Sequence, residues 1–124
     1  MKHIKSTLGI LLVGLLTFVS CTKDQNVNNF SFSGKVQKGP FVTGTTITAN
    51  ELNDNLGQTG MSFTTAITSD DGTFSLNNLE MESNLALLSG NGFYYNEVIG
   101  QLSSAPITLQ AIVDLTNNKT ININ

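Results

Sequence analysis

Reactive side chains are scarce in this chain of 124 residues. It has one histidine, one cysteine, six lysines and nine acidic residues, and it has no arginine. The histidine is His3 and the cysteine is Cys21, so the chain after residue 21 contains neither type. Serine and cysteine hydrolases need an imidazole base, and zinc sites use histidine or cysteine in nearly all cases. Carboxylate pairs and lysines are therefore the remaining candidates for catalysis.

Asp70 and Asp71, together with Asp54, have the carboxylate oxygens that calcium prefers. The spacing of an EF-hand is absent, because no acidic residue follows at the required positions. Gly72 comes directly after the two aspartates, and an Asp-Gly pair is typical of a hairpin turn. We therefore interpret Asp70 and Asp71 as part of a structural turn rather than as a calcium site.

A second acidic pair, Glu80 and Glu82, flanks Met81. A glycosidase needs two carboxylates that face each other across a cleft, about 5–9 Å apart. Nine acidic residues in a chain of this length will produce such separations by chance. We therefore predict no catalytic residue, no metal site and no cofactor, and we interpret the protein as a non-enzyme.

The aromatic cluster Phe93-Tyr94-Tyr95 is a candidate binding surface. Exposed aromatic rings stack on sugars and anchor protein interfaces. Successive side chains of a strand point to opposite faces, so Phe93 and one tyrosine are expected in the core and the other tyrosine at the rim. Tyr94 and Tyr95 are the candidate binding residues on this basis.

The first twenty residues have the pattern of a secretion signal. Lys2 and Lys5 precede an apolar run over residues 8–19, and Ser20 then precedes Cys21. A membrane-spanning helix needs about 20 apolar residues, so this run is too short to span a bilayer. A basic start, a short apolar segment and small residues are typical of a signal peptide.

The sequence FVSC over residues 18–21 resembles the lipobox of bacterial lipoproteins, with phenylalanine in place of the common leucine. The resemblance implies that residues 1–20 are a lipoprotein signal peptide and that Cys21 is acylated. Two or three acyl chains anchor firmly, because each buried CH₂ contributes about 0.8 kcal/mol. By the same resemblance, Thr22 in place of aspartate after the cysteine argues against retention in the inner membrane, and Lys23-Asp24 partly resembles the export signals of Bacteroidota surface lipoproteins. We expect an outer-membrane, lipid-anchored protein, exposed on the cell surface or held in the periplasmic leaflet.

After residue 20 the chain carries four lysines and nine acidic residues, a balance of −5. Surfaces that bind nucleic acids are basic, so we expect no nucleic-acid partner. Cys21 is the only cysteine and has no partner for a disulfide within the chain.

The rest of the chain has the two-residue period of strands and no helical period. Residues 22–29 are polar, so we interpret 21–29 as a tether and 30–124 as one domain. Alternating stretches between turn residues predict strands over 30–37, 45–52, 61–67, 73–76, 85–89, 94–102, 107–115 and 121–123. We therefore predict an all-β fold, a two-sheet β-sandwich of seven to eight strands.

Two stretches carry a family resemblance: GKVQKGPFVTG over residues 34–44 and SFTTAITSDDGTFSL over residues 62–76, which is followed by Gly92-Phe93. Their order resembles the carboxypeptidase regulatory-like, or transthyretin-like, superfamily, and this resemblance implies that the sandwich is Ig-like or transthyretin-like. Both are also similar to the N-terminal domain of large Bacteroidota outer-membrane lipoproteins. The resemblance covers about residues 30–116 and implies a spacer, binding module or assembly domain. Because the strand pattern is still running at Asn124, a domain truncated at its C-terminus is an alternative.

Some related pilin-type sandwiches join a lysine to an asparagine by an isopeptide bond, with the help of a buried acid. Lys35 lies on the first predicted strand. The candidate partners are Asn117, Asn118 and Asn122, with Glu97 or Asp114 as the acid. Alternation places Lys35 on the outward face, opposite to Phe32 and Val36. We therefore predict that this cross-link does not form.

These observations favour a lipid-anchored, non-catalytic β-sandwich with a structural or interaction role. A glycan-binding accessory of a polysaccharide-uptake system is one alternative, which depends on Tyr94 and Tyr95. A pilus-type assembly subunit is another, because an unfinished last strand would accept a strand from a partner. In each case we expect contact with a membrane through Cys21 and with a protein or a glycan.

Overall fold

Nine β-strands make up the regular structure of residues 26–124, the part of the chain that the computed structural model describes. They are β1 (Asn28–Val36), β2 (Thr46–Leu52), β3 (Gln58–Ala66), β4 (Thr73–Met81), β5 (Leu85–Gly92), β6 (Tyr95–Asn96), β7 (Gln101–Leu102), β8 (Ile107–Asp114) and β9 (Thr120–Ile123). The predicted all-β fold is confirmed. Within the described region, no helix has the length and apolar character needed to cross a membrane.

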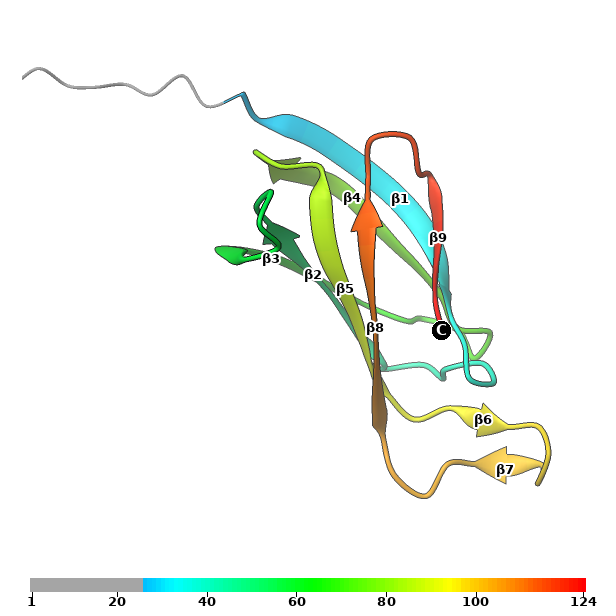
Figure 1. Ribbon diagram of the computed structural model, residues 1–124. Helices are drawn as coiled ribbons and strands as arrows, with labels where there is room; N and C mark the ends of the chain where they lie inside the picture. The colour runs from blue at the N-terminus through cyan, green and yellow to red at the C-terminus, as the bar shows by residue number, and fades with distance from the viewer. Residues whose placement is uncertain (1–25) are drawn as a thin grey trace, which may run out of the picture.

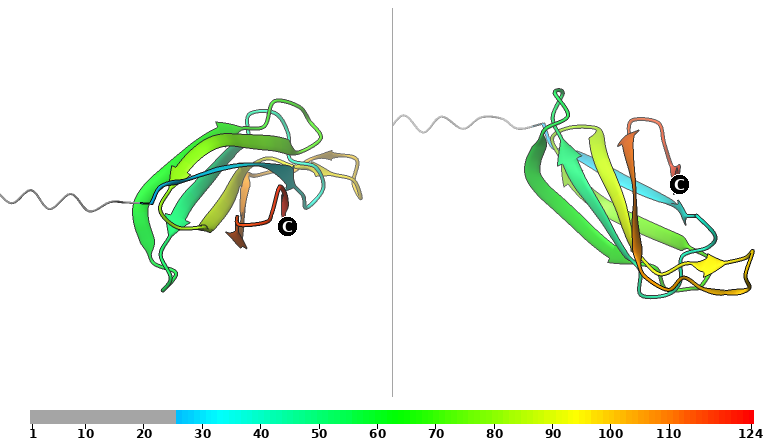
Figure 2. Two further views of the ribbon diagram at one scale, coloured as in Figure 1. Left: turned by 90° about the horizontal axis from the view of Figure 1, so that it is seen from above. Right: turned by 60° about the horizontal axis from the view of Figure 1, so that its bottom comes forward.

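Seven of these strands form the two layers of a sandwich (Figure 1). One layer has the strand order β4-β1-β9, and the other has the order β3-β2-β5-β8. Neighbouring strands are antiparallel except β1 and β9, which run parallel with Gly34 opposite Ile121. β6 and β7 pair only with each other and project beyond the layers as a small ribbon (Figure 2). The predicted sandwich of seven to eight strands is therefore confirmed, and the ribbon is an addition to it.

The core lies between the layers and follows the alternation of the sequence. Inward-facing residues are almost all apolar, because every second side chain of a strand points to the same face. Phe32 and Phe74 meet edge to face, with ring centroids 6.2 Å apart. The largest fully buried side chains are those of Phe41, Ile47, Ile67, Leu79, Met81, Leu88, Leu115, Ile123, Val36 and Thr45.

β4 is longer than predicted, because a bulge changes which residues face inward. The predicted strand ended at Leu76, whereas β4 continues to Met81. Leu76 is buried before the bulge and Leu79 after it, so the inward parity shifts by one residue. At the bulge Asn78 has a φ of 57°, and its N–H donates to the Ser31 hydroxyl at 3.0 Å. Asparagine adopts this left-handed conformation more readily than most residues.

Further predicted boundaries were wrong, since β3 begins at Gln58 rather than at residue 61 and β5 continues to Gly92 rather than ending at residue 89. The single strand predicted over 94–102 is interrupted by a turn, in which the Asn96 carbonyl accepts a hydrogen bond from the Gly100 N–H at 2.9 Å. The tether predicted over 21–29 overlaps β1, which begins at Asn28 because Asn28 and Asn29 pair with Met81 and Glu80. The polar residues at the start of β1 do not alternate with apolar ones, so the sequence pattern did not predict them as part of the strand.

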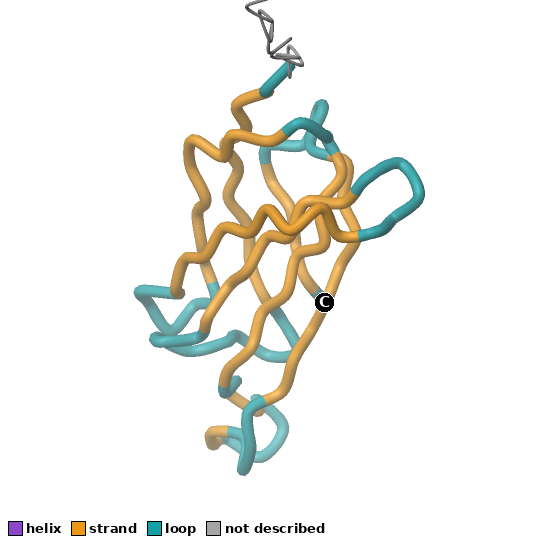
Figure 3. The backbone as a smooth tube through the Cα atoms, turned by 90° about the vertical axis from the view of Figure 1, so that its left-hand side faces the viewer, coloured by secondary structure: helices purple, strands orange, loops and turns teal. Residues whose placement is uncertain are grey.

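The strands run between two ends of the sandwich. The N-terminal end holds the start of β1 and the loops 53–57, 82–84 and 115–119. The ribbon end holds the segments 37–45, 67–72 and 93–106. Figure 3 shows the loops gathered at these two ends. The nine residues of β1 separate the ends by about 30 Å, so only loops at the same end can share a site.

Candidate functional site

The two candidate tyrosines lie in different environments at the ribbon end. Tyr94 is half-buried and stacks on Phe41, with ring centroids 6.0 Å apart and ring planes at 30°. Tyr95 is the first residue of β6 and is 40% exposed. One tyrosine thus packs inward and the other lies at the rim, as expected, but the core position expected for Phe93 was wrong, because Phe93 is 42% exposed. Tyr95 is the ring that a ligand could reach.

The ribbon, residues 95–102, holds apolar side chains in solvent. Val98 is 94% exposed at its turn, and Ile99 and Leu102 are exposed beside it. The turn is ordered, because the Asn96 side-chain oxygen accepts hydrogen bonds from the N–H groups of Val98 at 3.1 Å and Ile99 at 3.4 Å. Exposed apolar residues in a cluster mark interaction sites more often than isolated ones do.

A groove of about 490 Å³ runs beside the ribbon. Its lining residues come from three segments of the ribbon end: Pro40, Val42, Thr43, Asp70, Tyr95 and Leu102. The segments are fixed to one another, since the Pro40 carbonyl accepts a hydrogen bond from the Tyr95 N–H at 2.8 Å. The groove therefore combines an aromatic ring, an apolar floor and one carboxylate. The sequence singled out Tyr95 and Asp70 separately and gave no sign that they meet.

Asp70 is held in place by the chain on the other side of the groove. Its Oδ1 accepts a hydrogen bond from the Thr43 N–H at 2.8 Å. Hydrogen bonding from the backbone and the side chain of Thr43 lowers the pKa of Asp70 below its usual value. The carboxylate is consequently charged at neutral pH, and it can accept hydrogen bonds from hydroxyl or ammonium groups in the groove.

Asp71 closes the turn before β4. It accepts hydrogen bonds from the hydroxyl groups of Ser69 at 2.5 Å and Thr73 at 2.6 Å, and from the Thr73 N–H at 3.1 Å. These bonds, Ser69 first, lower the pKa of Asp71 far below its usual value. Its oxygens thus serve a structural turn, as predicted, but the hairpin typical of an Asp-Gly pair was wrong, because β3 and β4 belong to different layers and do not pair.

The third residue of the calcium hypothesis, Asp54, lies in the loop at the N-terminal end, whereas Asp70 and Asp71 lie at the ribbon end. The structure therefore does not bring these three residues together. Residues 26–124 contain no group of three histidine, cysteine, aspartate or glutamate residues that could hold a metal ion.

Glu80 and Glu82 are exposed, and Glu82 lines a pocket with a carboxylate that the sequence analysis did not select, Glu51. Glu51 is only 2% exposed, and its two oxygens accept hydrogen bonds from the Thr59 hydroxyl at 2.6 Å and the Ser83 N–H at 2.7 Å. Both oxygens are engaged, so Glu51 joins β3 to the loop after β4. Its inward parity, shared with Ile47 and Ala49, was the signal for its burial.

The residues considered for an isopeptide bond are arranged differently. The Lys35 ammonium lies 3.8 Å from an Asp71 oxygen, in a solvent-exposed ion pair. Asn122 uses its side-chain oxygen to accept a hydrogen bond from the Lys35 backbone N–H at 3.2 Å. Asp114 accepts hydrogen bonds from Asn84 and Thr116, and Glu97 is exposed in the ribbon turn. The outward position predicted for Lys35 is confirmed.

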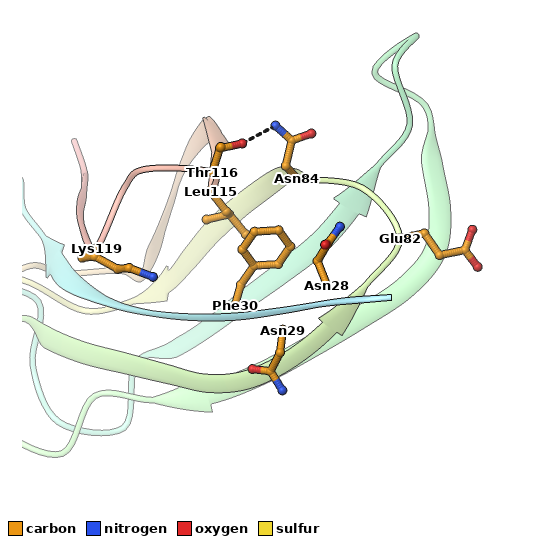
Figure 4. A pocket seen from close by; sticks show the side chains of 8 residues that line it. All are labelled: Asn28, Asn29, Phe30, Glu82, Asn84, Leu115, Thr116 and Lys119. Atoms are coloured by element: carbon orange, nitrogen blue, oxygen red, sulfur yellow. Dashed lines mark hydrogen bonds between the residues drawn. The ribbon is translucent and has the colours of Figure 1, made fainter. Parts of the chain in front are cut away.

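A second pocket of about 450 Å³ opens at the N-terminal end between β1 and the loops 82–84 and 115–119 (Figure 4). The aromatic residue that lines this pocket is Phe30, and its ring turns toward Leu115 and packs against the core. The Asn84 amide donates hydrogen bonds to Thr116 and Asp114, both at 2.7 Å. Asn28, Asn29, Glu82 and Lys119 also line this pocket, so it offers a ligand polar and charged groups, but it lacks the exposed aromatic ring of the groove beside Tyr95.

The predicted lipidation site, Cys21, lies outside the described residues. Comparison of the chain with protein-family models, with curated proteins and with solved structures finds no match to any of them.

Proposed function

We propose that the protein is a lipid-anchored β-sandwich that presents an interaction surface to a partner, and that it is not an enzyme. The anchor is Cys21, and the compartment is the outer membrane, with exposure at the cell surface. The interaction surface is the ribbon, with Tyr95, Val98, Ile99 and Leu102. The observation that carries the proposal is the 94% exposure of Val98 on a turn that Asn96 holds in place.

The position of the ribbon agrees with this role. β1 begins at the N-terminal end, and the ribbon projects from the opposite end (Figure 1). Seven residues separate Cys21 from Asn28, and they reach at most about 25 Å when fully extended. An anchor at Cys21 would therefore hold the N-terminal end near the membrane and leave the ribbon accessible.

The anchor is tested by the intact mass of the protein after extraction from the membranes of its host. We expect a mass that matches residues 21–124 plus acyl chains, and an unacylated product for Cys21→Ala. The interaction surface is tested in the same host cells by replacing Val98 with a photoreactive residue and looking for cross-linked partners. We expect cross-linked adducts from this position and none from Met61, an exposed apolar residue outside the ribbon. An unacylated wild-type chain would refute the anchor, and equal cross-linking from both positions would refute the surface.

The groove supports a second candidate function, the binding of a glycan. A sugar ring can stack on Tyr95 while its hydroxyl groups donate hydrogen bonds to the ionised Asp70, and both residues line the groove. This candidate uses the same end of the molecule, and it differs from the first in the chemistry of the partner.

Replacing Tyr95 with alanine is expected to weaken glycan binding by about tenfold, the effect of losing roughly 1.4 kcal/mol of ring stacking. Tyr95→Phe is the matched control, because it keeps the ring and removes only the hydroxyl. The measurement is binding to a glycan array, followed by titration calorimetry with the best ligand. If no glycan binds, or if Tyr95→Ala binds as well as Tyr95→Phe, this candidate is wrong.

A further inference from the structure

The strand β8 is a free edge of the four-stranded sheet. It pairs with β5 along its whole length, and no strand is hydrogen-bonded to its other side in the described structure, although β9 of the other layer approaches it. Proteins usually protect long edge strands with lysine, proline, a bulge or a covering segment. β8 has eight residues in a continuous register, without lysine, proline or bulge, and only Asp114 is charged.

The other sheet edges in residues 26–124 are irregular or short. β3 contains Gly60 with a φ of 96°, and its register with β2 shifts between Asn50 and Leu52. β4 carries the bulge at Asn78. β9 has only four residues. β8 is therefore the edge best suited to pair with another strand.

The free backbone groups of β8 belong to its even-numbered residues. The Leu115 N–H donates to the Asn84 carbonyl at 2.8 Å, and the same register continues along β5 and β8. Alternate residues of an antiparallel pair exchange both hydrogen bonds, so the odd-numbered residues bond to β5. The groups directed to the free edge are those of Thr108, Gln110, Ile112 and Asp114.

Apolar side chains accompany this edge on both faces of the sheet. On the outer face, Ile112 is 56% exposed. On the inner face, Ile107, Leu109, Ala111 and Val113 pack against the core but are only half-buried. A strand added beside β8 would cover parts of both faces and would use the free backbone groups at the same time.

We propose that β8 pairs with the β8 strand of a second copy of this chain, antiparallel and about a two-fold axis at Ala111. This alignment keeps like faces together, as a sheet requires. It places Thr108 opposite Asp114, Gln110 opposite Ile112, and Leu109 opposite Val113. The exchange forms about six backbone hydrogen bonds. The count excludes hydrogen bonds to the Asp114 carbonyl, because this carbonyl already accepts a hydrogen bond from the Asn118 side chain at 2.6 Å.

Charge and residue size favour a second copy in this register. Asp114, the only charge of β8, lies near one end, so the symmetric pair holds the two carboxylates about 20 Å apart. Ala111 falls on the axis, where facing Cα atoms approach to about 4.5 Å and a small side chain fits. A register shifted by two residues toward the start of β8 would place Pro106, which has no N–H, opposite Asp114. The two-fold contact closes on itself, so it forms a dimer rather than a filament.

The proposal goes beyond the proposed function, because it involves neither the anchor nor the ribbon. It is tested with the secreted full chain carrying Cys21→Ala, by sedimentation over a wide range of protein concentrations. We expect a reversible dimer. Ile112→Lys would place two lysines on the same face at diagonal positions, which lie about 7–8 Å apart, so their ammonium groups would repel each other. We therefore expect its dimer dissociation constant to rise about tenfold or more, which corresponds to roughly 1.4 kcal/mol.

The matched control is Met61→Lys, which adds the same charge at a residue that is 42% exposed on the edge strand β3. It should leave the dissociation constant unchanged, and circular dichroism should show that both variants are folded. Ala111→Cys should form a disulfide-linked dimer, because the two Cα atoms lie within the range for a disulfide. Thr108→Cys should not, although its side chain is more exposed. A monomer at every concentration, or a dimer that Ile112→Lys leaves intact, would overturn the proposal.

Discussion

Replacing Gly34 with alanine is expected to separate β9 from β1 and to lower the free energy of unfolding by about 3 kcal/mol or more. Gly34 lies on β1 between Phe74 of β4 and Ile121 of β9. A Cβ atom at this position would overlap the Ile121 carbonyl oxygen. A backbone carbonyl cannot rotate away as a side chain does, so β9 must move. The buried side chains of Ile121 and Ile123 move with it.

Denaturant unfolding measures the loss, and hydrogen exchange locates it. The amides of β9 should exchange fastest in the Gly34→Ala variant, while those of β2 and β5 keep most of their protection. Gly57→Ala is the matched control, because its Cβ would meet only the Asn53 side chain, at 3.1 Å. We expect it to change stability by less than about 1 kcal/mol. If Gly34→Ala were as stable as this control, the close contact between β1 and β9 would be disproved.

The strands that alternate most regularly were predicted best. Residues 107–115 have apolar side chains at every second position, and β8 with Leu115 follows them closely. Ile121 and Ile123 likewise predicted β9. In these segments a single pattern determines both the strand and its inward face. The number of strands in the two layers followed from counting such segments and the turns between them.

The alternation of apolar and polar residues along one strand carries no information on bulges or on which strands pair. The bulge at Asn78 shifts the parity of β4, so the alternation appeared to end at Leu76. The parallel pairing of β1 with β9 depends on the whole path of the chain, which local periodicity does not contain. For these reasons most strands were predictable, while the full extent of β4 and the strand partners were not.

The candidate groove illustrates the same limit. Asp70 and Tyr95 line one groove because two different loops end at the same end of the sandwich. Each residue was identified alone, as an acidic turn residue and as an aromatic residue. Their meeting depends on the hydrogen bonds of Thr43 with Asp70 and of Pro40 with Tyr95. Such long-range contacts can be found only once the strand order is known.

Replacing Phe41 with alanine is expected to lower the free energy of unfolding by about 3–5 kcal/mol. Phe41 is fully buried, and its ring stacks on Tyr94. Its N–H donates to the Val36 carbonyl at 3.3 Å, so the residue joins the end of β1 to the base of the ribbon. A cavity at this point cannot be filled easily, because the chains on both sides are fixed by backbone bonds. Total stabilities are about 5–15 kcal/mol, so the loss would be a large share.

Urea unfolding gives this change as a lower midpoint with an unchanged slope. Phe93→Ala is the control, since Phe93 is exposed and should cost less than about 1 kcal/mol. The contact with Tyr94 also links the core to the groove, because Tyr94 directly precedes Tyr95. In Phe41→Leu, which fills part of the cavity, the fold should survive while the amides of the ribbon exchange faster than in the wild type. If the ribbon amides were unchanged in Phe41→Leu, the ribbon would be held by its own turn and by the Pro40 hydrogen bond, and its preorganisation would not depend on the core.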